Sequence, residues 1–308
     1  MAYGRIFQIT INCSTGDTFT INEGDVDFSC VRDDKPEPNE ATLTIWGITA
    51  DSQNRIAVAG SVVSVAAGYK DEGLLTLFQG EVSSAVTVKP DDVYGLEITM
   101  HESLIPYRAS ATARNFKKDS LLSDALKLVA QDMGLGVQVS KAAAALRLDK
   151  NLSAAALSRD VLNSLCKPLN ATWSIHYQSI LVTAGDSLTA GVASFSPASG
   201  LLGVPRLKTY TPKRHKKKTK SKTKKKTYQF PPPKSQIDYS KGARRQIGVI
   251  EGVAFESLLR GGIDVGSEVE LSSPSLGQGW RVAITKVSHR FGTRDSGAWS
   301  SGFEGVIS

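Results

Sequence analysis

The chain has 308 residues, of which 41% are hydrophobic and 22% are charged, and its formal net charge is +7. This length and composition are ordinary for a globular protein of two or three domains with sizeable cores. No apolar run approaches the roughly 18 residues of a membrane-spanning helix, and the first residues lack the pattern of a signal peptide, so we expect no membrane span.

Residues 1–107 show the alternation of apolar and polar side chains that is typical of β-strands. The alternating segments are residues 7–11, 19–21, 41–46, 61–66, 74–80, 82–88 and 95–100. They recur at a spacing of about ten residues and are separated by polar, proline-containing turns, which is typical of a β-barrel or β-sandwich. We interpret residues 1–107 as an N-terminal β-barrel domain.

Residues 108–198 change to a helical pattern. Leu122, Leu126, Val129 and Met133 are spaced to share one face of a helix over residues 120–133. Asp119 or Ser120 is expected to cap its start. Gly134 follows the last apolar residue, where a left-handed C-cap is expected.

The same arrangement recurs after a fixed offset of 36 residues, which pairs Leu126 with Leu162 and Gly134 with Asn170. Glycine and asparagine are the residues that best tolerate a left-handed cap. We therefore predict two helix-then-strand units related by internal duplication. Pro168 lies in the last turn of the second helix and is expected to loosen it. The predicted α+β domain spans residues 108–198.

Residues 199–308 return to strand patterns and form the predicted C-terminal β-barrel domain. Residues 280–291 and 298–307 are expected to form a hairpin around a polar turn at 292–297. Trp280, Val282 and Ile284 share one face, but the apolar phase then shifts by one residue to Val287 and Phe291. Such a shift predicts a β-bulge.

A basic segment interrupts this domain at residues 212–240. It is rich in lysine and proline and has few apolar residues, so we expect a loop without fixed structure. Its positive residues are Lys213, Arg214, Lys216, Lys217, Lys218, Lys220, Lys222, Lys224, Lys225 and Lys226. Without these ten charges the net charge of +7 becomes −3, so the rest of the chain is mildly acidic.

The sequence offers no convincing catalytic, cofactor-binding or metal-binding set. Three cysteines without metal-type spacing are expected to be reduced and buried, although a Cys13–Cys30 disulfide remains an alternative. His289 is expected to be a half-buried structural residue. The run Gly-Asp-Ser-Leu at 185–188 matches a hydrolase motif, but no downstream Asp lies three residues before a His, so an exposed turn is favoured.

The order of the C-terminal segments resembles that of phage baseplate hub proteins. The segments are an SGLLGVP run at 199–205, a VAFESLL run at 253–259, a GSEVEL run at 266–271 and the hairpin that begins with WRVAITKVSH at 280–289. The string of Leu162, Leu165, Cys166, Trp173 and Ile175 also resembles the α+β domain of these hubs. The resemblance covers about residues 110–308 well and the first hundred residues only in general character.

The resemblance implies a mainly β fold with an α+β insert between two barrels, and a structural rather than enzymatic role. It implies a homotrimeric ring at the end of a phage tail, below the tail tube and above the spike. Two similar barrels per copy would adapt a sixfold tube to a threefold spike around a channel for DNA. Other baseplate proteins and the tape measure are further expected partners. We expect assembly in the bacterial cytoplasm and a final location in the virion.

The basic segment leaves three interpretations open: contact with a partner protein, a solvated loop, or sequence-independent contact with DNA. Tyr228 and Phe230 follow the lysines rather than alternating with them, so base stacking is not indicated. Two other classes of function remain as alternatives to the hub. One is a nucleic-acid-binding protein that acts through the basic segment, and the other is a cell-wall hydrolase of the tail tip.

Overall fold

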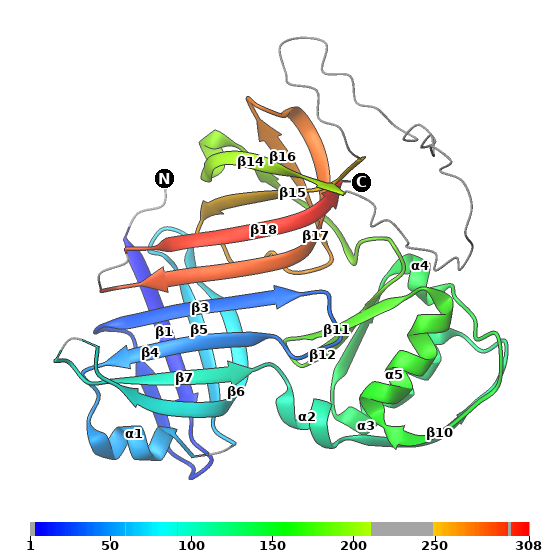
Figure 1. The fold of residues 1–308 in the computed structure, drawn as a ribbon, viewed down its shortest axis with the longest axis horizontal. Coiled ribbons are helices and arrows are strands. Elements are labelled where there is room, and N and C mark those ends of the chain that lie inside the picture. Colours follow the sequence, from blue (N-terminus) through cyan, green and yellow to red (C-terminus); the bar gives the residue numbers. More distant parts are fainter. Residues whose placement is uncertain (1–3, 59, 91, 211–248, 295–296, 308) are drawn as a thin grey trace, which may run out of the picture.

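The computed structural model describes residues 4–58, 60–90, 92–210, 249–294 and 297–307. Over these residues the protein is mainly β, with a sheet of thirteen strands, a sheet of three strands and a pair of strands. A smaller α+β segment lies at one end of the large sheet (Figure 1). No helix in these ranges is long and apolar enough to cross a membrane.

The large sheet contains strands from both halves of the chain. Its N-terminal strands are β1 (Arg5–Asn12), β2 (Thr18–Ile21), β3 (Val26–Asp33), β4 (Glu40–Trp46), β5 (Val62–Tyr69), β6 (Gly73–Val88) and β7 (Gly95–His101). Its C-terminal strands are β13 (Thr189–Phe195), β14 (Leu201–Tyr210), β15 (Val249–Leu258), β16 (Ser267–Ser273), β17 (Gly277–Gly292) and β18 (Trp299–Ile307). The strands expected between residues 7 and 100 are present, except that the two expected at 74–80 and 82–88 form the single strand β6.

Strand β3, which the sequence interpretation missed, joins the two halves. The order in the sheet is β14-β15-β18-β17-β3-β4-β7-β6-β5-β1-β2, with β13 paired to β16 and β16 paired to β17. Strand β3 therefore pairs with β4 on one side and with β17, more than 240 positions later in the chain, on the other. Figure 1 shows the strands from β14 to β6 stacked in this order, with β1 and β5 running behind them.

Two hydrophobic cores lie behind the large sheet. The first is enclosed by β1 and β3–β7 and also receives Leu259, Phe291 and Trp299 from the C-terminal half. The ring of Phe291 packs 5.2 Å from the ring of Phe28 and 6.0 Å from that of Phe7, measured between centroids. Burial of one such side chain stabilises a fold by about 1.5–3 kcal/mol. The other core is formed by the C-terminal strands alone.

The C-terminal hairpin has the predicted form. Strands β17 and β18 pair antiparallel, and the register shifts between Ile284 and Lys286. This is the position where the apolar phase of the sequence shifts, so the predicted bulge is confirmed. Thr285 is the extra residue, and the strand beyond it places Val287 and Phe291 in the cores.

The α+β segment has its own hydrophobic core and consists of short helices and strands. Its elements are α2 (Leu104–Ala109), β8 (Ala111–Phe116), α3 (Leu122–Met133), β9 (Gly136–Val139), α4 (Lys141–Ala144), β10 (Leu152–Leu157), α5 (Ser158–Cys166), the 3-10 turn η1 (Lys167–Leu169), β11 (Thr172–His176) and β12 (Ser179–Thr183). Helices α3 and α5 pack together above the sheet β11-β12-β9. Helix α1 (Ala50–Ile56) and the turn η2 (Pro197–Ser199) complete the described elements.

The C-terminal ends of the two helical units agree with the prediction. Gly134 and Asn170 are both left-handed, with φ of 68° and 52°. The last turn of the second unit, which contains Pro168, is a 3-10 turn rather than an α-helix, as expected for a proline there.

The predicted N-cap of α3 is wrong. Leu121 occupies the cap position and makes no capping hydrogen bond from its side chain. The chain is held instead by backbone bonds, from Asp119 N to Leu148 O (2.9 Å) and from Leu122 N to Leu146 O (2.9 Å). The hydroxyl of Ser120 turns away and donates to Lys117 O. Because of this pairing, α3 begins at Leu122, two residues after the predicted start at residue 120.

The cysteines are free thiols in the interior, as predicted: Cys13, Cys30 and Cys166 are all buried and unbridged. Burial raises the pKa of Cys30 to about 11 and that of Cys166 to about 12. These thiols therefore remain protonated and act as small apolar side chains.

Candidate assembly surface

One face of the large sheet continues across eight strands, from β14 through β15, β18, β17, β3, β4 and β7 to β6 (Figure 1). Alternate side chains of each strand point to this face, while the others enter the cores. One row across the face consists of Leu202, Glu256, Gly302, Ser288, Val31, Glu40 and His101. The two halves of the chain therefore share one outward surface, which we call the eight-strand face.

Small and polar side chains predominate on this face, and a groove of about 510 Å³ runs over its C-terminal half. The charged residues of that half are Arg206, Lys208, Glu256, Lys286, Arg290 and Glu304. Those of the N-terminal half are Asp27, Asp33, Glu40, Glu81 and Glu97. The C-terminal half thus has a net positive charge and the N-terminal half a net negative charge.

The eight-strand face ends in an open strand edge on each side. Strand β14 pairs with β15 on its inner side, and within the described ranges no strand pairs with its outer side. At the other end, the first half of β6 pairs with β5, and Val82 N donates to Ser61 O (2.9 Å). Beyond it, residues 83–88 pair with no strand other than β7, although the Thr87 hydroxyl donates to Gln53 Oε1 of α1 (2.8 Å). Unpaired strand edges are ready templates for contact with another chain.

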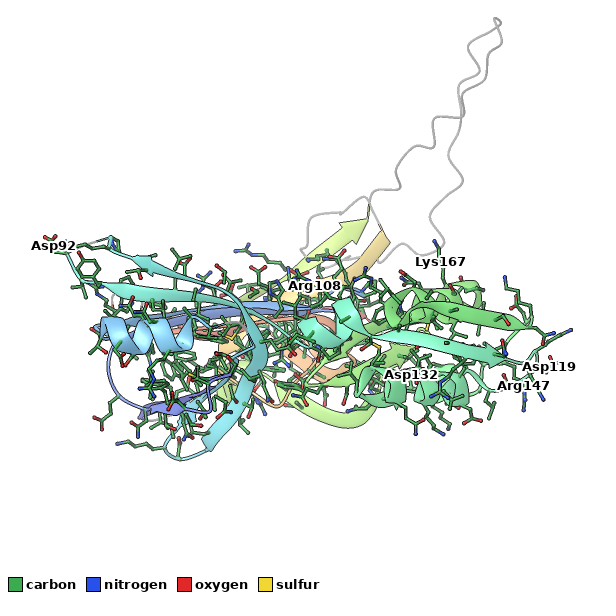
Figure 2. All side chains as sticks on the ribbon, turned by 90° about the horizontal axis from the view of Figure 1, so that it is seen from below. Asp92, Arg108, Asp119, Asp132, Arg147 and Lys167 are labelled. Atoms are coloured by element: carbon green, nitrogen blue, oxygen red, sulfur yellow. The ribbon has the colours of Figure 1, made fainter. Side chains whose placement is uncertain are left out.

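Both edges carry exposed apolar side chains. On β14, Val204 is 66% exposed and Leu202 39% exposed, and on β6, Val86 is 54% exposed. In Figure 2 the turn after β6, marked by Asp92, forms one extremity of the elongated molecule, and Asp119 and Arg147 lie at the other.

A buried polar cluster lies behind the face, where the two halves of the large sheet and the α+β segment meet. Its members are Arg32, Glu102, His176, Tyr177, Asp264 and His289, and we call it the Arg32 cluster. Arg32 extends inward from β3 and is only 1% exposed. Its guanidinium donates to Asp264 Oδ1 (2.5 Å) and to Leu77 O (2.8 Å), and it stacks on the ring of Tyr177 at 4.4 Å.

Tyr177 reaches Arg32 from an unusual backbone conformation. It forms with Gln178 the two-residue turn between β11 and β12, and both residues have positive φ, 44° and 59°. A type I′ turn requires such angles, which are costly for a tyrosine. The Tyr177 hydroxyl donates to Thr76 O at 3.1 Å, so its ring links the α+β segment to β6.

Glu102 and His176 occupy a second, connected part of the cluster. Asn39 donates from Nδ2 to Glu102 Oε2 (2.8 Å) and to Ile175 O (3.0 Å). Burial raises the pKa of Glu102 to about 7, although Arg32 and Asn39 counteract part of this effect. Burial, with the nearby Arg32 charge, lowers the pKa of His176 to about 3.

His289 is a neutral member with a fixed tautomer. Its Nε2 faces the Arg32 guanidinium at 3.4 Å, where it can only accept a hydrogen bond. Its Nδ1 must then carry the proton and donate to Ser301 Oγ at 2.8 Å. Burial and the Arg32 charge lower its pKa to about 3. The expected half-buried histidine is therefore fully buried, because the neighbouring strands and the loop around Arg260 cover it.

The Arg32 cluster is suited to holding segments together rather than to catalysis. Imidazoles with pKa values near 3 are weak bases at neutral pH, and the hydroxyls that they contact, those of Ser174 and Ser301, are themselves buried. In the part of the chain that the structure describes, no group of three His, Cys, Asp or Glu side chains could hold a metal ion. The cluster bonds join β3, β6, β17, the loop before β16 and the turn after β11.

The Gly-Asp-Ser-Leu run forms a turn after β12 and has a capping function. Asp186 accepts hydrogen bonds from Ser140 Oγ (2.5 Å) and Ala142 N (2.8 Å) at the start of α4. Burial alone would raise the pKa of Asp186, but these hydrogen bonds lower it below its usual value. Ser187 contacts only Glu268, at 3.5 Å, and its hydroxyl makes no described bond to a histidine.

The site residues predicted from the sequence, Lys213 to Lys226, lie outside the described residues, and nothing in the structure bears on them. The sequence interpretation also missed the Arg32 cluster. A usable signal was present in β3, where the inward positions Val26, Phe28 and Cys30 are followed by Arg32. An arginine at an inward position of a strand requires buried partners.

No protein-family model and no curated protein sequence matches the chain. Solved structures do match it. The 43 kDa tail protein of prophage MuSo2 from Shewanella oneidensis is 11% identical, with a TM-score of 0.61, over 98% of this chain and 100% of that one. The tail protein from Neisseria meningitidis MC58 is 12% identical, with a TM-score of 0.63, over 99% of this chain and 97% of that one.

A component of the Escherichia coli type VI secretion system, described as structurally similar to the T4 bacteriophage tail proteins gp27 and gp5, also matches. It is 9% identical, with a TM-score of 0.55, over 92% of this chain and 74% of that one. The chain therefore has the fold of phage tail and related secretion proteins. This confirms, at the level of fold, the resemblance to baseplate hubs seen in the sequence.

Proposed function

We propose that the chain is a structural protein of a phage tail, namely a baseplate hub that assembles as a trimeric ring. The observation that carries the proposal is the match in fold over nearly the whole length of two tail proteins. The proposed parts are an N-terminal barrel (residues 1–107), an α+β domain (108–198) and a C-terminal barrel (199–308).

The eight-strand face supports a ring geometry. A sheet with an open edge at each end can be continued by the next copy, and a contact between two different edges closes into a ring when the rotation fits. The free part of β14 and the free part of β6 are offset along the strand direction. Their contact therefore requires strands that are inclined to the ring axis, as in closed barrels.

Three copies would give six similar barrels and would connect a sixfold tube above to a threefold spike below. In this arrangement the eight-strand face lines the channel. Polar and small side chains with mixed charge suit a surface along which DNA passes without being retained. The proposal includes contacts with other baseplate proteins and the tape measure, assembly in the bacterial cytoplasm, and a final location in the virion.

The Arg32 cluster supports a mechanical role rather than an enzymatic one. A ring that transmits force between tube and spike needs its barrels to keep a fixed relative position, and buried bonds between distant strands provide this. Neither alternative, a nucleic-acid-binding protein or a cell-wall hydrolase, is favoured by a described feature. The capping role of Asp186 gives the hydrolase-like run a structural explanation.

The test is light scattering coupled to size exclusion on nuclease-treated protein at low and high salt. A particle of about three times 33.0 kDa at both salt concentrations is expected for the ring. Electron micrographs of that particle should show a threefold ring with an open centre. A monomer that elutes with nucleic acid at low salt only would contradict the hub and favour the basic segment as the functional element.

A further inference from the structure

Five consecutive strands of the N-terminal half and five of the C-terminal half have the same arrangement. Their orders in the sheet are β3-β4-β7-β6-β5 and β14-β15-β18-β17-β16. All neighbouring pairs within both sets are antiparallel. Since β17 and β3 are antiparallel as well, each strand runs in the same direction as its counterpart. We call these sets the two five-strand units.

The long strands β6 and β17 correspond in detail. Each has 16 residues, and each contains one extra residue in its pairing with the next strand of the chain, Ser83 in β6 and Thr285 in β17. Before the extra residue, each strand pairs with the strand that precedes it in the chain, β5 or β16. Val82 and Ile284, just before the extra residues, are both buried, so the inward faces match as well.

The two long strands differ beyond the extra residue. In β17, residues 286–292 pair with β3 and so join one five-strand unit to the other. In β6, residues 84–88 pair with no strand other than β7 within the described ranges. This half of β6 therefore lies where its own unit would join a further unit through a strand of the β3 type.

The pairing registers show that the counterpart of β3 is β14. Following the registers from the extra residues through β7 and β4, or through β18 and β15, aligns Val31 with Lys208 and Cys30 with Leu207. Burial agrees with this alignment. Val31 and Lys208 are both exposed, whereas Cys30 lies in a core and Leu207 packs against one.

We propose that the register of β17 on β3 is repeated between copies, so that residues 84–88 of β6 pair antiparallel with residues 206–210 of β14 of the next copy. This proposal rests on the ring-forming function above and assigns the register of its contact. Because Ser288 pairs with Val31 inside the chain, Val86 lies opposite Lys208 of the next copy. The contact consists of backbone hydrogen bonds, and the outward side chains remain on the eight-strand face.

The alignment also decides between a ring and a closed pair. Pairing of β6 with β6 would be twofold and would leave both β14 edges open, and it would place a strand of the wrong type in the β3 position. Pairing of β6 with β14 uses both open edges of every copy, so the contact can continue until a ring closes.

Engineered cysteines test the register. The variant Val86→Cys/Lys208→Cys places thiols at directly opposed positions, where Cβ atoms are about 4.5–5.5 Å apart and a disulfide needs little movement. Both wild-type side chains are exposed, so the variant is expected to fold, which thermal melting under reducing conditions verifies. The native thiols are buried and serve as background. After mild oxidation, the products are separated on a denaturing gel without reductant.

We expect a covalent trimer of about three times 33.0 kDa, which returns to the monomer on reduction. Co-expression of the single variants Val86→Cys and Lys208→Cys should give covalent dimers and no trimers, because each copy then carries only one of the two thiols. Each single variant alone should run as a monomer, because this contact brings no two identical positions together.

Two matched controls accompany the test. Ser288→Cys/Val31→Cys places thiols at the equivalent pair inside the chain and should form an intramolecular disulfide, seen as two thiols protected from alkylation at monomer mass. Val86→Cys/Arg206→Cys moves one thiol by two residues, to a diagonal position about 7–8 Å away, and should cross-link roughly tenfold more slowly.

The outcomes separate this inference from the function on which it rests. A trimeric wild type whose Val86→Cys/Lys208→Cys variant does not cross-link, while the internal control does, overturns the repeated register and leaves the hub intact. Faster cross-linking of the diagonal pair, or covalent dimers of Val86→Cys alone, also overturns the register. A wild type that is monomeric at every concentration and salt overturns the self-assembling ring and this register together.

Discussion

Arg32 Nη1 donates to Asp264 Oδ1 over 2.5 Å and so joins β3 to a loop 232 positions later in the chain. The same guanidinium binds Leu77 O and stacks on Tyr177, so one side chain contacts both halves of the large sheet and the α+β segment. Local sequence cannot form any of these contacts. They form only when both halves of the large sheet and the α+β segment pack together, and they fix the relative positions of these parts.

Replacement of Arg32 by methionine is expected to destabilise the fold by about 3 kcal/mol. Methionine approximates the volume of the arginine stem but leaves Leu77 O and Asp264 without their donor, and the loss of a buried partner is costly. Urea unfolding measures the change. The matched control is Arg290→Met on the exposed face, for which we expect a change within about 0.5 kcal/mol. Equal effects of the two substitutions would contradict the assigned role of Arg32.

The stability of the protein should fall with acid because of His176 and His289. Both have folded-state pKa values of about 3, well below the ordinary value of 6.5. A depressed pKa means that the unfolded chain binds protons more readily, so the stabilisation is present above about pH 6.5 and is lost as the pH falls towards 3. Glu102 acts in the opposite direction. Its pKa of about 7 favours the folded state as the pH falls from about 7 towards its ordinary value of 4.5.

Between pH 6.5 and 4.5, acidification destabilises the fold through the two histidines and stabilises it through the one carboxyl. The net effect is therefore a loss of stability. Denaturant unfolding at several pH values measures this slope. His289→Gln is expected to reduce the pH dependence of the free energy of unfolding by the equivalent of about one bound proton, independently of its effect on stability at neutral pH. An unchanged slope in this variant would show that His289 is already protonated in the folded protein.

The fold was largely predictable from the sequence where short-range patterns determine it. The alternation at residues 41–46, the helical spacing from Leu122 to Met133 and the phase shift after Ile284 each predicted the element that is present. These signals need only neighbouring residues. The bulge is the clearest case, because a single extra residue at Thr285 follows directly from the requirement to keep Val287 and Phe291 inside.

The parts that could not be predicted depend on contacts between distant residues. The pairing of β3 with β17, which joins the N-terminal and C-terminal strands into one sheet, leaves no mark in either strand alone. The Arg32 cluster likewise draws its members from five separate segments. The N-cap of α3 was mispredicted for a related reason, since pairing with residues 146–148 moved its start.

Gly134→Ala provides a test of the left-handed cap of α3. Gly134 has φ of 68°, and an added Cβ would meet nothing within 4 Å, so the cost is backbone strain alone. We expect a loss of about 1–2 kcal/mol in the free energy of unfolding. Asn170→Gly, at the equivalent cap of the second unit, should be neutral or slightly stabilising because glycine tolerates this conformation better. A destabilised Asn170→Gly variant would instead assign a side-chain role to Asn170.

Substitutions of Asp186 and Ser187 distinguish a capping function of the Gly-Asp-Ser-Leu run from a hydrolytic one. Asp186→Ala removes the acceptor for Ser140 Oγ and Ala142 N and should cost about 0.5–2 kcal/mol of stability, as measured by urea unfolding. Ser187→Ala should leave stability within about 0.5 kcal/mol of the wild type. In a zymogram on bacterial cell walls, wild type and both variants should give no clearing. Clearing by the wild type that Ser187→Ala abolishes would establish the hydrolase alternative.

Replacement of residues 213–226 by an uncharged Gly/Ser segment of equal length tests the basic segment. It removes ten positive charges, so the formal net charge changes from +7 to −3. We expect the trimer mass to be unchanged, because neither edge of the eight-strand face includes these residues. Any co-elution with nucleic acid at low salt should disappear in the variant, since such binding depends on neutralised phosphates and declines steeply with salt. Loss of the trimer at both salt concentrations, in a variant that still melts as the wild type does, would assign the segment to copy–copy contact.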